Sequence, residues 1–231
     1  MKITDSIYLV PGGVGANVYV FLGKEATVLI DTGMGGNASK ILEFVKGLGE
    51  EPPQIAYIVL THSDIDHCGN AAQLKALTSA KVAIHKADGP RLSGEQKPKE
   101  VKGAMSVLFT IISPFMRFNP VIPDILLEDS ALIAGLTVIH TPGHSAGSIA
   151  LYLPGEVVFV GDALRVNKQG LPVLSSSAMT ADVDLAKASV KKLSELNFQV
   201  LLPGHGPPIL LDAAIKLKEF VANGFQHSAN S

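Results

Sequence analysis

Thr61-His62-Ser63-Asp64-Ile65-Asp66-His67-Cys68-Gly69-Asn70 is the stretch that decides how the rest of this chain is interpreted. It follows the apolar run 55–60, which predicts a buried strand. Six consecutive positions of this stretch contain four side chains that can bind metals: His62, Asp64, Asp66 and His67. In a near-extended segment alternate side chains point the same way, so we expect His62, Asp64 and Asp66 to converge and His67 to face another side. Such an arrangement suits two adjacent metal ions better than one.

Three later segments carry the same residue types directly after a glycine, each where an apolar run ends. They are Pro142-Gly143-His144, Val160-Gly161-Asp162 and Pro203-Gly204-His205. Glycine permits backbone angles and close approaches that a turn presenting a ligand needs, and loops on a rigid scaffold are where functional residues concentrate. One such loop would mean little. Three of them, together with the first cluster, predict a metal site assembled from distant parts of the chain.

The composition indicates a compact protein with a sizeable core, because 47% of the 231 residues are hydrophobic and only 17% are charged. The formal net charge of −2 and the lack of a Lys/Arg-rich run argue against nucleic acid as a partner. We therefore expect a small-molecule substrate, and the sequence leaves a monomer and a homodimer equally open.

The expected location is the cytoplasm. A single cysteine, Cys68, excludes an internal disulfide framework and fits a reducing compartment. The first five residues carry an acid and lead into no long apolar run, so no signal peptide is expected. No run of about 18 apolar residues occurs either, so no membrane span is expected.

Apolar strands alternate with helical patterns along the chain, which indicates an α/β fold. Strands are predicted at 7–10, 17–22, 26–30, 55–60, 81–85, 136–140, 148–153, 157–160 and 200–202. Helices are predicted near 41–48, 71–77, 182–196 and 213–222, the third with Asp182 as its N-cap. We expect one domain over residues 1–231.

Residues 89–124 interrupt this alternation and predict a helical insertion or cap. Its apolar part contains Phe109, Phe115, Met116 and Phe118. The pattern favours packing, in a cap or at a dimer interface. The functional alternative is that these side chains roof the metal site and bind an acyl chain or another apolar group. Arg165 lies shortly after Asp162 and could contact a polar part of the substrate, although a solvated loop is equally compatible.

The set His62-x-Asp64-x-Asp66-His67, His144, Asp162 and His205 resembles the metallo-β-lactamase-fold hydrolases, whose signature is H-x-H-x-D-H followed by later His, Asp and His. Asp31-Thr32-Gly33 and Thr141-Pro142-Gly143-His144 are also similar to stretches typical of that superfamily, in its glyoxalase II and lactonase-like branch. The resemblance spans nearly the whole chain. It implies a four-layer αββα sandwich with the site along one edge.

The resemblance also implies a role for each matching residue. One metal would bind His62, Asp64 and His144, the second would bind Asp66, His67 and His205, and Asp162 would bridge the two. The implied cofactors are two divalent ions, zinc above all, with iron or manganese possible. They would lower the pKa of a bridging water so that hydroxide attacks a carbonyl carbon. Asp66 would orient that hydroxide as the catalytic carboxylate, and Asp31 would steer a ligand imidazole without touching a metal.

Asp64 departs from the family pattern, which has histidine at this position. A carboxylate oxygen can reach the same metal, but it adds one negative charge. The hypothesis is a site that is less Lewis-acidic and more tolerant of iron or manganese. Flavodiiron reductases also resemble the pattern and carry a carboxylate here, although theirs is a glutamate.

The function expected from this resemblance is hydrolysis of a carbonyl ester such as a lactone or a thioester. Three alternatives remain: a diiron redox protein related to the flavodiiron reductases, a phosphodiesterase or β-lactamase side activity, and a metal-binding scaffold without turnover. Three residues near the motifs have simpler explanations. We expect structural roles for His85 and His140 at strand ends, and Cys68 to be a small buried thiol rather than a ligand.

Overall fold

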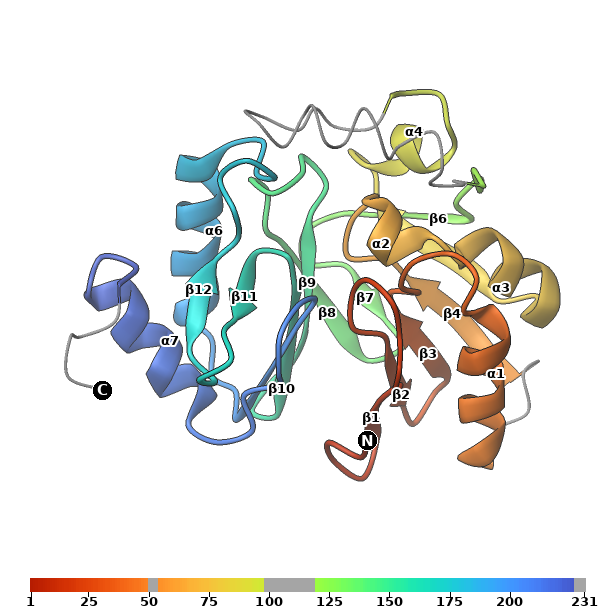
Figure 1. Cartoon of the computed structure of the whole chain (residues 1–231), viewed down its shortest axis with the longest axis horizontal. Helices are drawn as coiled ribbons and strands as arrows, with labels where there is room; N and C mark the ends of the chain where they lie inside the picture. The colour runs from red at the N-terminus through yellow and green to blue at the C-terminus, as the bar shows by residue number, and fades with distance from the viewer. Residues whose placement is uncertain (50–53, 98–118, 227–231) are drawn as a thin grey trace.

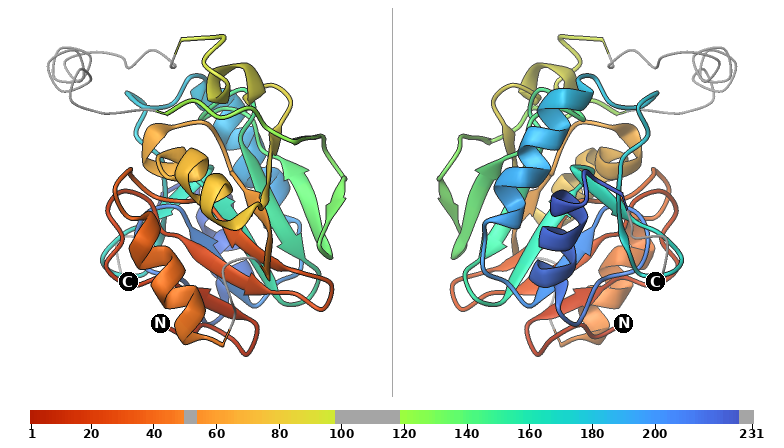
Figure 2. Two further views of the ribbon diagram at one scale, coloured as in Figure 1. Left: turned by 90° about the vertical axis from the view of Figure 1, so that its right-hand side faces the viewer. Right: turned by 90° about the vertical axis from the view of Figure 1, so that its left-hand side faces the viewer.

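Two β-sheets stack face to face, with helices on both outer faces (Figure 1). The computed structural model describes residues 1–49, 54–97 and 119–226. Helices α1 (Ala38–Gly47) and α3 (Ala71–Thr78) cover the first sheet, and helices α6 (Val183–Ser194) and α7 (Ala213–Ala222) cover the second. The two views of Figure 2 show each helix pair on its own side of the molecule. The predicted α/β sandwich of four layers is therefore confirmed.

The first sheet contains six strands in sequence order. They are β1 (Ile7–Leu9), β2 (Tyr19–Leu22), β3 (Thr27–Ile30), β4 (Ile55–Val59), β5 (Lys81–His85) and β6 (Ile125–Leu127). The first three pair antiparallel, and β3 to β6 run parallel. The carboxyl ends of parallel strands meet at one edge of a sheet. The residues that follow β3, β4 and β5 therefore emerge together.

The second sheet has the order β13-β10-β9-β8-β7. Its strands are β7 (Leu132–Ile133), β8 (Leu136–His140), β9 (Ile149–Leu153), β10 (Val157–Gly161) and β13 (Val200–Pro203). Only β10 and β13 are parallel. Asp162 and His205 consequently leave this sheet at the same edge. A separate hairpin, β11 (Leu164–Val166) and β12 (Pro172–Leu174), follows Asp162.

Three apolar layers hold the sandwich together. The layer between the sheets includes Tyr19 and Phe159, whose rings pack edge to face with their centroids 5.5 Å apart. Ile41 and Leu74 pack their helices onto the first sheet, and Val190 packs α6 onto the second. Because the longer strands of the central layers are mostly buried, they read in the sequence as continuous apolar runs.

The predicted elements agree with the structure except where strands and helices are very short. α7 and β5 have the predicted bounds, and the Asp182 side chain caps α6 by accepting a 2.9 Å hydrogen bond from the Leu185 N–H. The short strands β6, β7, β11 and β12 were not predicted. Of the proposed insertion, the structure describes α4 (Gly89–Leu92) and the segments that flank residues 98–118; those 21 residues, with all four of the apolar side chains named above, lie outside the described part. The extent of a single domain stays a prediction. Within the described part, no helix combines the length and the apolar character needed to cross a membrane.

Candidate metal centre

The cluster of polar residues lies at the edge of the sandwich where β3, β4, β8, β10 and β13 end. The segment after β4 corrects one expectation. It is extended only as far as Asp64 (φ −70°, ψ 142°), which begins the short helix α2 (Ile65–Cys68), and the Asp64 carbonyl accepts hydrogen bonds from His67 and Cys68 N–H at 2.9 and 3.0 Å. A helix rotates side chains by about 100° per residue. Asp66 therefore does not converge with His62 and Asp64 but turns with His67 toward a second group.

The first group, called here the first triad, consists of His62, Asp64 and His144. Asp64 Oδ2 lies 3.1 Å from His144 Nε2 and 3.5 Å from His62 Nε2. The two histidine side chains are 1% and 2% exposed, against 17% for Asp64. The first triad thus lies deep in the edge of the sandwich.

The second triad consists of Asp66, His67 and His205. His205 Nε2 lies 3.1 Å from Asp66 Oδ2 and 3.4 Å from His67 Nε2. His67 is fully buried, whereas the side chains of Asp66 and His205 are 29% and 21% exposed. The second triad is therefore the more exposed of the two.

Asp162 lies between the two triads. Its Oδ1 is 3.4 Å from His67 Nε2, and its Oδ2 is 3.6 Å from both His144 Nε2 and His205 Nε2. Gly204 makes room for this arrangement, since a Cβ at that position would come within 2.5 Å of Asp162 Oδ1 and 2.6 Å of His67 Cε1. Asp162 can therefore serve both groups at once.

Asp31 supports the imidazole rings from behind. It directly follows β3 in the left-handed region (φ 57°), and its Oδ2 accepts a 2.8 Å hydrogen bond from His67 Nδ1. The same carboxylate accepts bonds from the Thr61 N–H and hydroxyl, and the hydroxyl lies 3.1 Å from His62 Nδ1. With Nδ1 of His67 held as a donor, the neutral ring has its lone pair on Nε2, which faces the cluster.

The electrostatics of the cluster follow from packing carboxylates against histidines. Burial alone would lower the pKa of His67, but the carboxylates of Asp31 and Asp162 outweigh it and raise that pKa well above its usual value. Burial would likewise raise the pKa of Asp162, yet His67 and His144 hold it below its usual range. The pKa of Asp66 is lowered in the same way, against burial, by His205 and His67. Among the described residues, these groups form a site that favours bound positive charge.

The donor set fits metal ions. Ligand atoms about 2.1 Å from a tetrahedral metal lie about 3.4 Å apart. Four of the ligand pairs within the triads are 3.1 to 3.5 Å apart, and all ligand atoms of a triad lie within 4.8 Å of one another. His62 Nε2 and Asp162 Oδ1 are buried and have no hydrogen-bond partner among the described residues. Buried polar atoms almost always have hydrogen-bond partners. Buried ligand atoms that lack one, in a cluster of further histidines and aspartates, are typical of a metal site.

The remaining predicted positions divide into three kinds. Cys68 is a buried thiol whose pKa is raised, first by burial, and whose Sγ lies 3.4 Å from the Ser63 carbonyl. His85 and His140 stack at 4.0 Å, and burial followed by the His140 charge lowers the pKa of His85; the described residues form no metal-binding group around them. Arg165 is exposed on β11. Its substrate contact stays a prediction.

Sequence reasoning missed one buried residue beside the cluster, Asp88. It follows β5 at the same edge of the sheet as the triads and is 0% exposed. A charged residue just beyond the carboxyl end of a parallel strand was the available signal.

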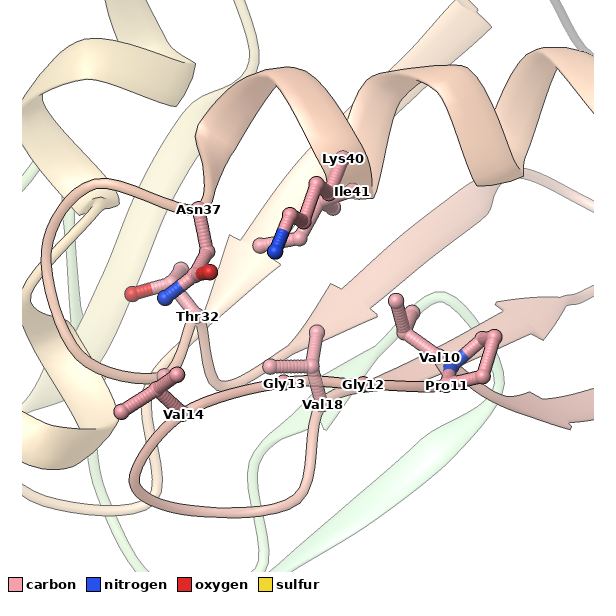
Figure 3. Close-up of a pocket in the computed structure, with 11 residues that line it drawn as sticks. Val10, Pro11, Gly12, Gly13, Val14, Val18, Thr32, Asn37, Lys40 and Ile41 are labelled. Atoms are coloured by element: carbon pink, nitrogen blue, oxygen red, sulfur yellow. The ribbon is translucent and has the colours of Figure 1, made fainter.

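A small pocket between the loop after β1 and helix α1 is too small to be an alternative functional site. Figure 3 shows Val10 and Pro11 on one side of it and Lys40 and Ile41 of α1 on the other. Its volume of about 10 Å³ holds about one water molecule. Thr32 lines this pocket and also donates a 2.8 Å hydrogen bond to the His67 carbonyl, so its wall supports the second triad.

The αββα sandwich with paired His/Asp triads at one edge defines a metal-binding α/β protein. Residues 11–205 match the family model described as the metallo-beta-lactamase superfamily. The chain belongs to this superfamily and is one of its metallo-hydrolases. The predicted family is thereby confirmed.

Named relatives and solved structures agree with this assignment. The chain is 32% identical over 218 residues to the probable metallo-hydrolase YflN of Bacillus subtilis, covering 84% of this chain and 81% of that protein. It is 28% identical to the human acyl-coenzyme A thioesterase MBLAC2 (82% and 72% covered) and 23% identical to the N-acyl homoserine lactonase of Bacillus thuringiensis (77% and 74% covered). The crystal structure of TTHA1623 in a di-iron-bound form superposes with a TM-score of 0.70 at 29% identity, covering 90% of this chain and 96% of that one.

Proposed function

We propose that each triad binds one divalent metal ion, that Asp162 bridges the pair, and that the site hydrolyses a carbonyl ester of a small molecule, a lactone or a thioester. The observation that carries the proposal is the position of Asp162 between two triads with the same donors, two histidines and one aspartate each. When bound, such ions supply a nucleophile from water at neutral pH and a Lewis acid for the carbonyl oxygen.

The chain's own residues account for the rest of the reaction. The lowered pKa of Asp66 keeps its carboxylate ionised at neutral pH, ready to accept a hydrogen bond from the attacking water and orient it. Asp31 holds the proton of His67 on Nδ1. Substrate approaches from the side of Asp66 and His205, because these are the two histidine or aspartate side chains of the triads with the greatest exposure.

The substrate class rests on chemistry shared by the relatives. MBLAC2 is named for thioester cleavage and the Bacillus thuringiensis relative for lactone cleavage. Both reactions pass through attack on an acyl carbon, which a bound metal pair promotes. Both are also small-molecule reactions, which agrees with the lack of a Lys/Arg-rich run in the sequence.

The hydrolase proposal is tested with a panel of thioesters, lactones, phosphodiesters and β-lactams, each assayed with zinc, manganese and iron. We expect turnover of a thioester or lactone that is lost on chelation and in His67→Ala. Asp124→Asn is the matched control, since Asp124 bonds to Lys75 and to the Val82 N–H on the outer side of the first sheet, away from the triads. Turnover that survives both chelation and His67→Ala would contradict the mechanism.

Metal identity is the second part of the proposal. Asp64 gives the first triad a carboxylate in place of the family histidine, so the two triads are equally hard as donor sets and accept iron or manganese as well as zinc. Protein grown in mixed metals should contain more than one of these metals by elemental analysis, and Asp64→His should shift the content toward zinc. Exclusive zinc at two equivalents in both proteins would sink this idea.

A diiron redox protein is the alternative that a specific observation favours, namely the likeness to TTHA1623 in its di-iron form. In that case the iron-loaded protein should show visible absorption or an EPR signal that changes on reduction, and no acyl substrate should turn over. Esterase activity with zinc alone would decide against it, because zinc has no redox chemistry.

A further inference from the structure

Asp88 is a buried carboxylate for which the metal chemistry described so far gives no role. It is 0% exposed and stands immediately before α4, three residues beyond the end of β5. Its side chain does not cap that helix. A buried carboxylate is costly unless several donors satisfy it. The donors that satisfy Asp88 therefore show what holds it in place.

Two of these donors belong to the loop that carries His62 and Asp64. Asp88 Oδ2 accepts hydrogen bonds from the N–H of Ser63 at 2.9 Å and from its hydroxyl at 3.0 Å. Ser63 is the residue between the two ligand positions. Its backbone therefore fixes the points from which both side chains leave the chain.

The other short bonds come from the loop that carries His144. Ser145 Oγ donates to Asp88 Oδ2 at 2.8 Å, and the Gly147 N–H donates to Oδ1 at 2.8 Å. A Cβ on Gly147 would lie 2.6 Å from the Asp88 backbone nitrogen and 2.7 Å from its Cβ and Cγ, so this close approach requires glycine. Arg91 adds a longer contact at 3.5 Å.

We propose that Asp88 is a positioning residue for the first metal: it joins the two loops that present His62, Asp64 and His144 and sets their spacing. This inference rests on the proposed metal-binding role of the first triad. Asp88 bonds to a residue adjacent to each of the three ligands and to none of the second triad's neighbours. Loss of this carboxylate should consequently weaken one metal site and spare the other.

The test uses two backgrounds that each leave one triad intact. His205→Ala keeps the first triad, and His144→Ala keeps the second. Zinc affinity is measured by competition with a chromophoric chelator, and the geometry is followed through the visible spectrum of bound cobalt. We expect Asp88→Asn to weaken binding about ten-fold in the His205→Ala background, the lower end for partners that orient ligands, and to change the cobalt spectrum there. In the His144→Ala background the affinity should stay within about two-fold.

Two further variants keep the test decisive. Asp124→Asn is the control for loss of a carboxylate that binds a backbone N–H, and it should change neither affinity. If Asp88→Asn does not fold by circular dichroism, the double variant Ser63→Ala with Ser145→Ala removes both hydroxyl bonds to Asp88 and should weaken metal binding only at the first triad.

The outcomes separate this inference from the function it builds on. A wild-type chain that binds two metal ions, combined with unchanged first-triad affinity in a folded Asp88→Asn or in the double variant, would overturn the role of Asp88 and leave the metal centre standing. Equal weakening of both triads would also overturn it, because that is the signature of a general structural defect. A wild-type chain that binds no metal would overturn both.

Discussion

The two triads have the same donors but differ in burial and in what holds them. In the first triad the most exposed side chain, Asp64, is 17% accessible, whereas Asp66 and His205 of the second reach 29% and 21%. Asp31 bonds directly to the His67 imidazole, whereas Asp88 bonds to backbone N–H groups of the two loops that carry the ligands of the first triad. The residues that support each triad, Asp31 and Asp88, can thus give identical donor sets different properties.

This difference suggests that the two triads have different roles in the proposed centre. Under the proposed function, the buried first triad would change little when substrate arrives, while the second triad would meet substrate and supply the Asp66 carboxylate that orients water. The supports match these tasks, because a ring held through its Nδ1 hydrogen bond has a fixed tautomer, whereas joined loops fix a distance between ligands.

The largest effect is expected from removing the residue that both triads share. Asp162→Ala should abolish the bridging position, leave His67, His144 and His205 facing one another without a carboxylate between them, and lower turnover by about 10³-fold or more. Elemental analysis should show loss of at least one metal equivalent. Asp124→Asn serves as the control. Full metal content with normal turnover in Asp162→Ala would contradict the shared role of Asp162, because neither triad would then depend on it.

The next effect isolates the second triad. Asp31→Asn keeps the size of the side chain but removes the charge that holds the His67 Nδ1 proton. Zinc affinity of the second triad, measured in the His144→Ala background, should fall about 10- to 100-fold. A smaller loss is expected in the His205→Ala background, because Asp31 reaches His62 only through the Thr61 hydroxyl. Equal losses of zinc affinity in the two backgrounds would show that Asp31 does not support the second triad more than the first.

A matched pair of glycine substitutions tests how tightly the two triads are packed against each other. Gly204→Ala would place a methyl group against Asp162 and His67, and overpacking of this kind costs about 1–3 kcal/mol. Metal affinity and thermal stability should both fall. Gly47→Ala at the end of α1 meets nothing within 4 Å and should be neutral or stabilising by up to about 1 kcal/mol. Similar melting temperatures for the two variants would show that the space beside Asp162 is not tight.

The smallest effect concerns a carboxylate outside the centre and provides the reference for the others. Burial opposes the charged form of Asp124, but the Lys75 ion pair and the Val82 N–H lower its pKa below the usual 3.8. A lowered pKa in the folded state stabilises the fold above pH 3.8, and this stabilisation is lost as the pH falls through the folded-state value. The difference in unfolding free energy between wild type and Asp124→Asn, from urea denaturation, should be present at pH 6 and shrink toward pH 3. A difference that grows on acidification would contradict this.

The fold and the members of the cluster could be predicted because their signals are local. Covered strands appear as apolar runs, and each residue later found in the cluster follows such a run or a glycine. The turn at Asp64 could not be predicted, because a four-residue helix has too few positions to show a period. The extended-chain assumption placed Asp66 with His62 and Asp64, whereas the family resemblance grouped it with His67 and His205, the residues beside which it lies in the structure. The short strands β6, β7, β11 and β12 were missed because they too have too few positions to show a period.

Asp88 escaped sequence reasoning for a different reason. Its partners lie 25 and 57 residues away along the chain, at Ser63 and Ser145. The pairing of β4 with β5 brings Ser63 to Asp88, and the stacking of the two sheets brings Ser145 there. No motif links an aspartate after one strand to serines in two other loops. The substrate, the compartment and the oligomeric state likewise stay predictions, because they depend on more than this chain's internal contacts.

The most direct test of the account is the number of metal ions bound by the wild-type chain and by the two single-triad variants. Equilibrium dialysis against zinc, with elemental analysis of the folded protein, should give two equivalents for wild type and one for each of His144→Ala and His205→Ala. One equivalent in the wild type, or two equivalents retained in either variant, would contradict the claim that two triads sharing Asp162 hold two separate ions.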